Sequence, residues 1–323
     1  MLAVYAESLD PHDPLAGLVV GERPDPEVTP GWASVEVRAA ALNRHDLFSL
    51  RGVGLATDRL PMTLGCDAAG VDEDGNEVIV HAVIGDPDWR GDETLDPKRS
   101  LLSERYQGAL AERVAVPRRN LVPKPPSLSF EEAACLPTAW LTAYRMLFTQ
   151  SGLRPGDSVL VQGAGGGVAT ALISLGRAAG LRVFVTSRDE AKRTRALDLG
   201  AHDAVEPGTR LPQRVDAVME TVGAATWAHS VRSLRPGGTL VVSGLTSGAI
   251  PPDPELTRVF FLQLRIQGST MGTRDELAEL AALLDLSGAR PVIDRVLPLD
   301  RAREGFAAML DGDLFGKVVF TPR

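Results

Sequence analysis

Cysteine is scarce in this sequence. Only two cysteines, Cys66 and Cys135, occur among 323 residues. Two are too few for a disulfide framework, and they do not form the paired spacings of a structural zinc site. The sequence therefore predicts a protein of a reducing compartment.

Long apolar runs are also missing. No stretch of about 18 apolar residues occurs, so the sequence offers no membrane-spanning helix. The opening residues, MLAVYAESLDPHDP, contain no basic region and reach acidic residues before any long apolar run, unlike a secretory signal. We therefore expect a cytoplasmic protein that does not bind a membrane.

Positive charge is in deficit. The chain has 34 Lys and Arg against 42 Asp and Glu, for a formal net charge of −8, and no run of Lys or Arg marks a basic patch. Such a surface does not attract polyanions, so we expect no nucleic-acid partner. Aromatic residues make up only 5%, but 44% hydrophobic and 24% charged residues are typical of a well-buried globular protein.

The chain is long enough for two domains, and the pattern changes along it. Residues 1–120 predict strands and loops, including the alternating run Trp32–Ala41 and the β-rich run Glu77–Val83. The turn-rich stretch Asp86–Ser103 predicts a surface loop. After a proline-rich connector, Ser129 precedes two acidic residues in the manner of a helix start.

Between Ser158 and Gly268, short apolar runs alternate with helical segments. This order predicts an α/β fold with a doubly wound parallel sheet. The predicted strands are Ser158–Gln162, Arg182–Thr186, Val215–Glu220, Thr239–Ser243 and Leu264–Gly268. The end of the chain predicts a strand at Pro291–Leu297, a helix at Leu299–Leu310 and a strand at Lys317–Thr321.

A glycine turn, GAGGGVA, lies between the first of these strands and a helix. Apolar residues recur at i, i+3, i+4 and i+7 from Val168, so one helix face packs on the sheet while the N-terminus lies beside the turn. Free N–H groups and the positive end of the helix dipole suit a pyrophosphate there. The predicted cofactor contacts are Ala164, Gly165, Gly166, Gly167 and Val168.

The next strand ends at Ser187 and Arg188, about 20 residues beyond the glycines, where an NAD site usually places a carboxylate. A serine followed by a cation suits a 2′-phosphate, and Lys192 lies one helical turn further on. Asp189 and Glu190 are interpreted as first-turn carboxylates of the following helix. The pattern favours NADPH over NADH; the alternative is a solvated Arg/Lys face.

These residues carry a resemblance to the medium-chain dehydrogenase/reductase superfamily, and within it to zinc-independent, quinone oxidoreductase-like (zeta-crystallin-like) members. The resemblance covers nearly the whole chain. Its motifs are Ala40–Gly52, Leu60–Val71, Gly108–Pro117, Pro125–Tyr144, the glycine turn, Leu234–Gly244 and Phe315–Phe320.

The resemblance implies two domains. Residues 1–120, completed by 290–323, would form a mostly β GroES-like catalytic domain, and residues 121–289 a Rossmann NADP-binding domain. It further implies an active-site cleft at the junction and a homodimer built through the cofactor domains.

The resemblance also bears on zinc. The positions that hold catalytic zinc in metal-bearing relatives align here with Asn43, Cys66 and Thr138, a poor match to the N and S ligands that zinc prefers. The cysteine-rich lobe that holds a second, structural zinc has no counterpart, because Asp86–Ser103 contains no cysteine. We expect no bound metal.

The resemblance places Asn43, His45 and Arg51 in the catalytic cleft as donors toward the substrate. His45 either donates a proton or is a structural histidine. Arg51 either reaches the cofactor or pairs with Asp67. The neighbouring Asp46 is expected to hold the loop by hydrogen bonds.

Further cofactor contacts are implied by the resemblance alone. Thr142 would touch the nicotinamide side, and the other contacts would come from strand ends. Lys317 either approaches the cofactor or is a solvated charge at a strand start. The strand-end residues are Thr221, Val222, Ser243, Gly244 and Leu245.

The leading hypothesis is an NADPH-dependent, zinc-independent oxidoreductase that transfers hydride to a quinone, enone or related small carbonyl. Without a metal, acceptors that delocalise the developing negative charge are favoured. Two alternatives stay open: an alcohol dehydrogenase or aldehyde reductase of the same superfamily, and a non-catalytic NADPH-binding protein.

Overall fold

The computed structural model describes residues 1–322 and divides them into two compact units. Unit 1 comprises residues 1–141 and 271–323, and unit 2 comprises residues 142–270. No helix in residues 1–322 is both long and apolar enough to cross a membrane. Contacts thus assign residues 121–141 and 271–289 to unit 1. The expected domain boundaries near 120 and 289 stay a prediction, because a compact unit and a folding domain need not end at the same residue.

Unit 2 is built on a six-stranded parallel sheet with the order β13-β12-β11-β14-β15-β16. This is the 3-2-1-4-5-6 order of a dinucleotide-binding sheet, so the predicted doubly wound fold is confirmed. Its strands are β11 (Ser158–Gln162), β12 (Arg182–Thr186), β13 (Asp203–Val205), β14 (Val215–Glu220), β15 (Leu234–Val242) and β16 (Arg265–Gly268).

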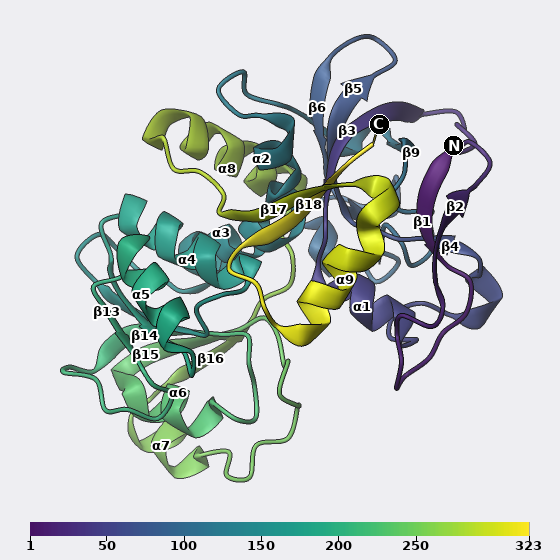
Figure 1. Ribbon diagram of the computed structural model, residues 1–323. Coiled ribbons are helices and arrows are strands. Elements are labelled where there is room, and N and C mark those ends of the chain that lie inside the picture. The colour runs from purple at the N-terminus through teal and green to yellow at the C-terminus, as the bar shows by residue number, and fades with distance from the viewer. Residues whose placement is uncertain (323) are drawn as a thin grey trace. The chain divides into compact units, whose positions relative to one another are not determined.

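Helices cover both faces of this sheet, with α4 and α5 on one side and α6 and α7 on the other (Figure 1). Their bounds are α4 (Gly167–Ala178), α5 (Glu190–Asp198), α6 (Trp227–Ser233) and α7 (Leu256–Phe261). On α4, the predicted apolar face is buried at Ala171, Leu172 and Leu175, while Val168 at its N-terminal end is only half-buried.

Unit 1 is mostly β. A seven-stranded sheet has the order β10-β6-β5-β3-β18-β17, with β9 pairing to β3, and smaller sheets have the orders β2-β1-β4 and β7-β8. The strands are β1 (Leu2–Ala6), β2 (Leu18–Glu22), β3 (Trp32–Ala41), β4 (Met62–Thr63), β5 (Asp67–Asp72), β6 (Glu77–Val80), β7 (Val83–Ile84), β8 (Ser100–Leu101), β9 (Arg113–Pro117), β10 (Leu121–Pro123), β17 (Ile293–Pro298) and β18 (Lys317–Thr321).

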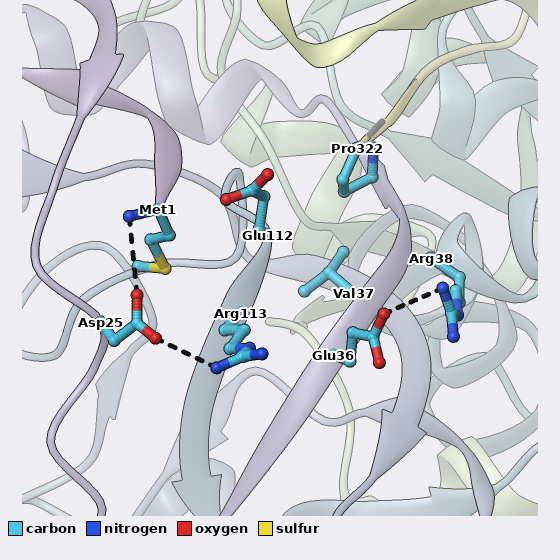
Figure 2. Close-up of a pocket in the computed structure, with 8 residues that line it drawn as sticks. All are labelled: Met1, Asp25, Glu36, Val37, Arg38, Glu112, Arg113 and Pro322. Carbon is cyan, nitrogen blue, oxygen red and sulfur yellow. Dashed lines mark hydrogen bonds and ion pairs between the residues drawn. The ribbon is translucent and has the colours of Figure 1, made fainter.

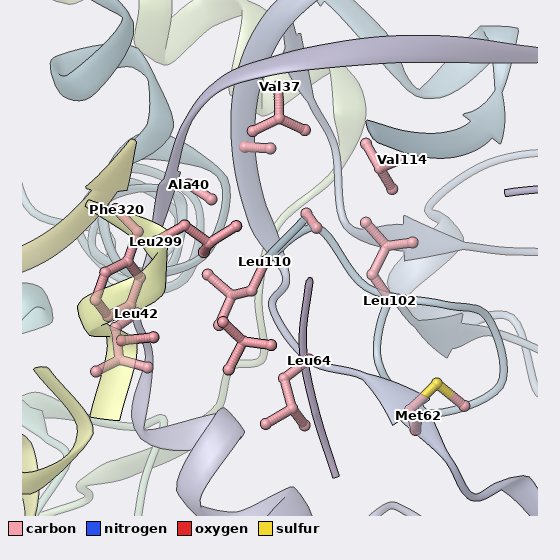
Figure 3. Close-up of a cluster of buried hydrophobic side chains, with 14 of the residues drawn as sticks. Val37, Ala40, Leu42, Met62, Leu64, Leu102, Leu110, Val114, Leu299 and Phe320 are labelled. Carbon is pink, nitrogen blue, oxygen red and sulfur yellow. The ribbon is translucent and has the colours of Figure 1, made fainter. Parts of the chain in front are cut away.

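The chain end rejoins the first half within unit 1. Strand β18 pairs antiparallel with β3, and Phe320 lies in the core with Leu42, Leu110 and Leu299 (Figure 3). Because β18 lies beside β3, Lys317 on β18 comes next to Asn43, which follows β3 in the sequence.

The helices of unit 1 are short apart from two. They are α1 (Arg44–Leu50), α2 (Phe130–Ala134), α8 (Arg274–Ser287) and α9 (Ala302–Asp311). Ser129 begins α2 as predicted: its hydroxyl accepts the N–H of Glu132, and the Glu132 carboxylate accepts the N–H of Ser129. Helix α3 (Leu141–Tyr144) spans the boundary of the two units between π-helical turns at Leu136–Trp140 and Arg145–Gln150.

Candidate functional site

The glycine turn of unit 2 leads from β11 into α4. Gly163 has φ +88°, a conformation that favours glycine, and Gly166 is the residue before the helix. The N–H of Thr170 makes the helix bond to the carbonyl of Gly166, so the N–H groups of the first turn have no partner within the helix. No atom lies within 4 Å of a Cβ built on Gly166. The turn can therefore take a pyrophosphate.

The residues that follow β12 include an exposed cation, and the nearest carboxylate there is used to cap a helix. Asp189 begins α5 and accepts the N–H of Lys192 at 3.1 Å, which is the helix-start role expected of it. Arg188 is exposed, whereas Ser187 is half-buried and accepts the N–H of Asp189 at 3.2 Å. Arg193 adds a second guanidinium, which donates to the Ser187 carbonyl at 2.7 Å. These residues fit a 2′-phosphate.

The loops after β14 and β15 are joined by backbone hydrogen bonds. The N–H of Ser247 donates to the Val222 carbonyl at 2.7 Å, and the N–H of Thr246 donates to the Thr221 carbonyl at 3.3 Å. A Cβ on Gly244 would lie 3.0 Å from the Thr221 carbonyl. The predicted contacts from Ala164 to Leu245 thus follow the carboxyl ends of four adjacent parallel strands, which is where such sheets bind ligands.

Thr142 lies on α3 and is 6% exposed. Within the described residues it makes no hydrogen bond to these loops. Its predicted cofactor contact stays a prediction.

In unit 1, the structure joins two predicted site residues directly. Lys317 is 2% exposed, and its ammonium donates to the Asn43 side-chain oxygen at 2.5 Å, the Leu42 carbonyl at 2.8 Å and the Asp67 carboxylate at 3.1 Å. An ammonium has three N–H donors, and all three are used. The interpretation of Lys317 as a solvated charge is wrong, because the strand that carries it lies in the core.

Two buried carboxylates accompany this lysine. Asp46 accepts the N–H of Asn43 at 2.8 Å and that of Gly65 at 2.9 Å, the loop-holding role expected of it, and burial raises the pKa of its carboxyl. Asp67 is fully buried and pairs with Lys317. The alternative in which Arg51 pairs with Asp67 is therefore wrong, and its contact with the cofactor stays a prediction. Arg51 follows α1 as its C-cap, is half-buried and makes no ion pair in residues 1–322.

His45 belongs to a separate polar group. Its Nε2 lies 3.4 Å from the Ser49 hydroxyl and 3.7 Å from the Glu104 carboxylate, and the imidazole is 19% exposed. Glu104 also accepts the N–H of Leu101 at 3.3 Å. The arrangement provides His45 with a hydroxyl and a carboxylate that can exchange protons with it, and its catalytic role stays a prediction.

The residues at the zinc-aligned positions do not fit a zinc ion. The Asn43 oxygen is occupied by an ammonium, which would repel a dication. The Cys66 thiol donates to the Leu102 carbonyl at 3.2 Å, and burial raises its pKa well above the usual range, whereas zinc binds thiolate. The third residue, Thr138, offers a hydroxyl. No group of three or more His, Cys, Asp or Glu within residues 1–322 is placed to hold a metal.

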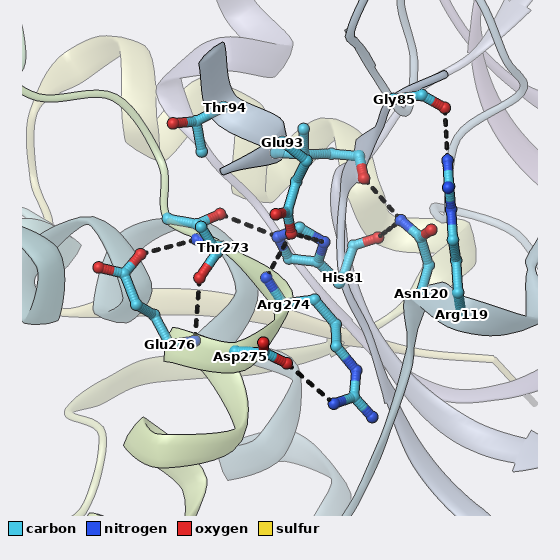
Figure 4. Close-up of polar contacts among 12 residues, drawn as sticks. His81, Gly85, Glu93, Thr94, Arg119, Asn120, Thr273, Arg274, Asp275 and Glu276 are labelled. Carbon is cyan, nitrogen blue, oxygen red and sulfur yellow. Dashed lines mark hydrogen bonds and ion pairs between the residues drawn. The ribbon is translucent and has the colours of Figure 1, made fainter. Parts of the chain in front are cut away.

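Hydrogen bonds hold the segment Asp86–Ser103, which contains no cysteine. The Glu93 carboxylate accepts the N–H of Arg274 at 2.6 Å and lies 3.9 Å from Nδ1 of His81, whose Nε2 bonds the Gly272 carbonyl at 2.9 Å (Figure 4). Buried Asp96 accepts the N–H of Lys98 at 2.8 Å. The expected loop is irregular apart from a 3-10 turn at Glu93–Leu95 and β8, and it is anchored to α8.

A surface groove of about 450 Å³ in unit 1 is lined by none of the predicted site residues (Figure 2). Its charged groups pair with one another: Asp25 accepts from Arg113 at 3.1 Å and lies 3.5 Å from the terminal ammonium, and Arg38 pairs with Glu36 at 3.0 Å. Because these charges are already paired and no predicted site residue lines it, we do not assign this groove a role in catalysis.

Three buried polar residues of unit 2 lie at this edge of the sheet and are not among the predicted site residues. Gln162, Thr186 and Glu220 are each at most 1% exposed, and each is the last residue of its strand. A polar residue that ends an apolar parallel strand was the available signal, because ligands bind at that edge.

Two family models match this chain. Residues 29–126 match the family model "Alcohol dehydrogenase GroES-like domain", and residues 167–285 match "Zinc-binding dehydrogenase". The synaptic vesicle membrane protein VAT-1 homolog of Mus musculus is 30% identical over 329 residues, covering 92% of this chain and 78% of that protein.

Two further similarities extend over nearly the full length. The acryloyl-coenzyme A reductase of Sulfurisphaera tokodaii is 28% identical over 96% of this chain and 98% of its own. A crystal structure of an NAD-dependent alcohol dehydrogenase superposes with a TM-score of 0.91 at 33% identity, covering 99% of each chain. The chain belongs to the medium-chain dehydrogenase/reductase superfamily.

Proposed function

We propose that the protein is an NADPH-dependent oxidoreductase that works without zinc and reduces conjugated acceptors such as quinones and enones. The observation that carries the proposal is the Lys317 ammonium, 2.5 Å from Asn43, at a position that aligns with a zinc ligand in metal-bearing relatives. A neighbouring carboxylate, Asp67, balances this charge. A buried ammonium thus already occupies Asn43, where it would repel a zinc ion.

The cofactor would be held by the turn at Gly163–Gly167 and by the residues after β12. First-turn N–H groups of α4 would bind the pyrophosphate, and Arg188 the 2′-phosphate. Bound NADPH supplies a hydride. The amide nitrogen of Asn43, which also donates to the Ala41 carbonyl at 3.3 Å, would orient the acceptor. His45, supported by Ser49 and Glu104, would deliver the proton that completes the reduction.

Conjugated acceptors suit a site of this kind. When hydride adds to an enone or a quinone, the negative charge spreads into an enolate or phenolate, so less stabilisation is required than for an isolated alkoxide. The name of one relative, acryloyl-coenzyme A reductase, supports this class, because an acryloyl thioester is a conjugated acceptor.

The choice of nucleotide is tested by Arg188→Ala. Loss of a charged partner for the 2′-phosphate should weaken NADPH binding by about 10- to 100-fold, and NADH binding should change by less than about twofold. Arg182→Ala is the matched control, because Arg182 begins β12, at the opposite end of the strand from the loop that carries Arg188. Equal losses for the two nucleotides, or an equal loss in the control, would contradict the proposal.

The choice of acceptor is tested by NADPH oxidation with a quinone, an enone, an enoyl thioester and a simple aldehyde. We expect turnover with conjugated acceptors and little with the aldehyde. Similarity to an NAD-dependent alcohol dehydrogenase favours the second candidate, an alcohol dehydrogenase or aldehyde reductase, and turnover with the aldehyde alone would establish it. Tight NADPH binding without any turnover would favour a non-catalytic binding protein.

We also propose that the protein is a homodimer formed through unit 2. Strand β16 is an edge strand, and all of its residues are exposed. An edge strand presents unpaired backbone groups and is a ready surface for pairing with another chain. Exposed apolar side chains precede it in the sequence, including Phe260 at 70% and Phe261 at 77%. A second copy would cover both features.

A further inference from the structure

The polar residues that end β11, β12 and β14 form one buried hydrogen-bonded network in unit 2. Glu220 is fully buried and accepts a hydrogen bond from the Ser230 hydroxyl at 2.6 Å. The Ser230 oxygen in turn accepts from the Gln162 side-chain amide at 2.9 Å, and the Gln162 oxygen accepts from the Thr186 hydroxyl at 2.7 Å. The Thr186 oxygen accepts the N–H of Gly163 at 3.2 Å.

The charge of Glu220 fixes the direction of every bond in this network. A carboxylate only accepts, so Ser230 must donate to it and can then only accept from Gln162. The amide nitrogen of Gln162 therefore faces Ser230, and its oxygen faces Thr186. The same nitrogen lies 3.1 Å from Nδ1 of His229, whose Nε2 bonds the Thr209 carbonyl at 2.9 Å.

The network reaches three loops to which we assign the cofactor. Through Thr186 it holds Gly163, the first residue of the glycine turn, and Thr186 itself immediately precedes Ser187. The other oxygen of Glu220 accepts the N–H groups of Val222 at 2.7 Å and Gly223 at 2.9 Å. The residues proposed to bind the pyrophosphate and the 2′-phosphate, and the predicted contacts Thr221 and Val222, are thus attached to one hydrogen-bonded network.

We propose that Gln162 is a positioning residue for NADPH, an inference that rests on the proposed function. It fixes the positions of the glycine turn, the end of β12 and the loop after β14 relative to one another. One nucleotide can then contact all three. A buried network whose members are all satisfied fixes geometry, and a gap in it leaves several buried groups unpaired. Gln162 has no role in the chemistry itself.

The test measures binding of NADP⁺, an acid-stable probe, by calorimetry, together with thermal unfolding. Gln162→Leu should weaken NADP⁺ binding by about tenfold, because three partners lose their bond and the loops lose their common register. Ser158→Ala is the matched control. Ser158 begins the same strand and its hydroxyl donates to the half-buried Asp216 carboxylate at 2.7 Å, away from the loops, so this variant should lose stability and keep its affinity within about twofold.

Gln162→Glu adds a signature that a merely structural role would not produce. Its carboxylate can accept from Thr186 but cannot donate to Ser230, so affinity relative to the unaltered protein should be poor at about pH 8. Burial and the neighbouring Glu220 raise the pKa of the new carboxyl, which outweighs the opposing effect of His229, 3.1 Å from the replaced amide nitrogen. On acidification the carboxyl is therefore protonated and donates to Ser230, and affinity recovers. The Leu variant should not recover.

The outcomes separate the two proposals. If the unaltered protein binds neither NADP⁺ nor NADPH, the proposed function fails and the inference fails with it. If it binds NADP⁺ and the Gln162 variants bind equally well, or if Ser158→Ala loses as much affinity, only the positioning role is overturned. Should Gln162→Leu not fold, the pH dependence of Gln162→Glu decides.

Discussion

At the scale of single residues, the unexpected feature is a lysine in the core. Sequence patterns treat a lysine at a strand start as solvated, and they cannot reveal that β18 lies in the middle of a sheet beside β3. Burial of Lys317 is tolerated because Asn43, Leu42 and Asp67 supply three acceptors. The pairing depends on contacts between residues 250 to 275 positions apart, which no local pattern encodes.

Lys317→Met should lower the free energy of unfolding by about 3–5 kcal/mol, because it leaves the Asp67 charge buried without its partner. Adding Asp67→Asn should recover part of this loss, since the pair is then replaced by neutral groups. Urea unfolding of the two single variants and the double variant measures the coupling. Losses that simply add would show that the two side chains do not interact as described.

At the scale of elements, most of the fold could be predicted. Strands β3, β11, β12, β14 and β18 have the predicted bounds, because alternating or continuous apolar runs bounded by turn residues are local signals. The structure begins β15 at Leu234, earlier than the predicted Thr239, and the predicted helix Leu299–Leu310 starts as a 3-10 turn before α9. Ends of elements depend on neighbouring strands and caps, which is why they were less well predicted.

Less of the candidate site could be predicted. The glycine turn and the helix-start role of Asp189 follow from local patterns, and the structure has both. The partners of His45 and Arg51 depend on tertiary packing, and the sequence left two readings open for each. The network around Gln162 was missed because its members are spread over three strands and one helix.

The anchoring of Asp86–Ser103 to α8 should depend on pH. Burial lowers the pKa of His81 below its ordinary value of 6.5, which outweighs the opposing effects of the hydrogen bond to the Gly272 carbonyl and of the Glu93 and Glu276 carboxylates, while Arg274 adds to the shift. The folded state therefore favours neutral His81, and the stability this gives is complete above 6.5 and is lost as the pH falls.

Urea unfolding at about pH 7.5 and about pH 5.5 checks this expectation. The unaltered protein should lose more stability on acidification than His81→Gln, whose amide can still donate to the Gly272 carbonyl but does not titrate in this range. The variant controls for the carboxylates that titrate in both proteins. Parallel losses in the two proteins would contradict a role for His81.

At the scale of the whole molecule, we propose a nucleotide on unit 2, a lysine-centred polar site in unit 1 and a chain that self-associates. The assembly is the part most easily tested. Phe260→Glu should convert a dimer to a monomer in sedimentation, because it puts a charge into the apolar surface that a second copy would cover. Leu286→Glu, which alters an apolar residue of unit 1 that is at least as exposed, should leave the dimer intact. A monomeric unaltered protein, or dissociation by both variants, would contradict the proposed interface.

The central claim is an NADPH-dependent site that needs no zinc, and one combined measurement tests it most directly. Energy transfer from tryptophan to the reduced nicotinamide is followed during titration with NADPH and with NADH, and zinc is measured in the same purified sample. The account predicts tighter binding of NADPH than of NADH and no stoichiometric zinc. One zinc ion per chain, or a preference for NADH, would contradict it and favour an alcohol dehydrogenase.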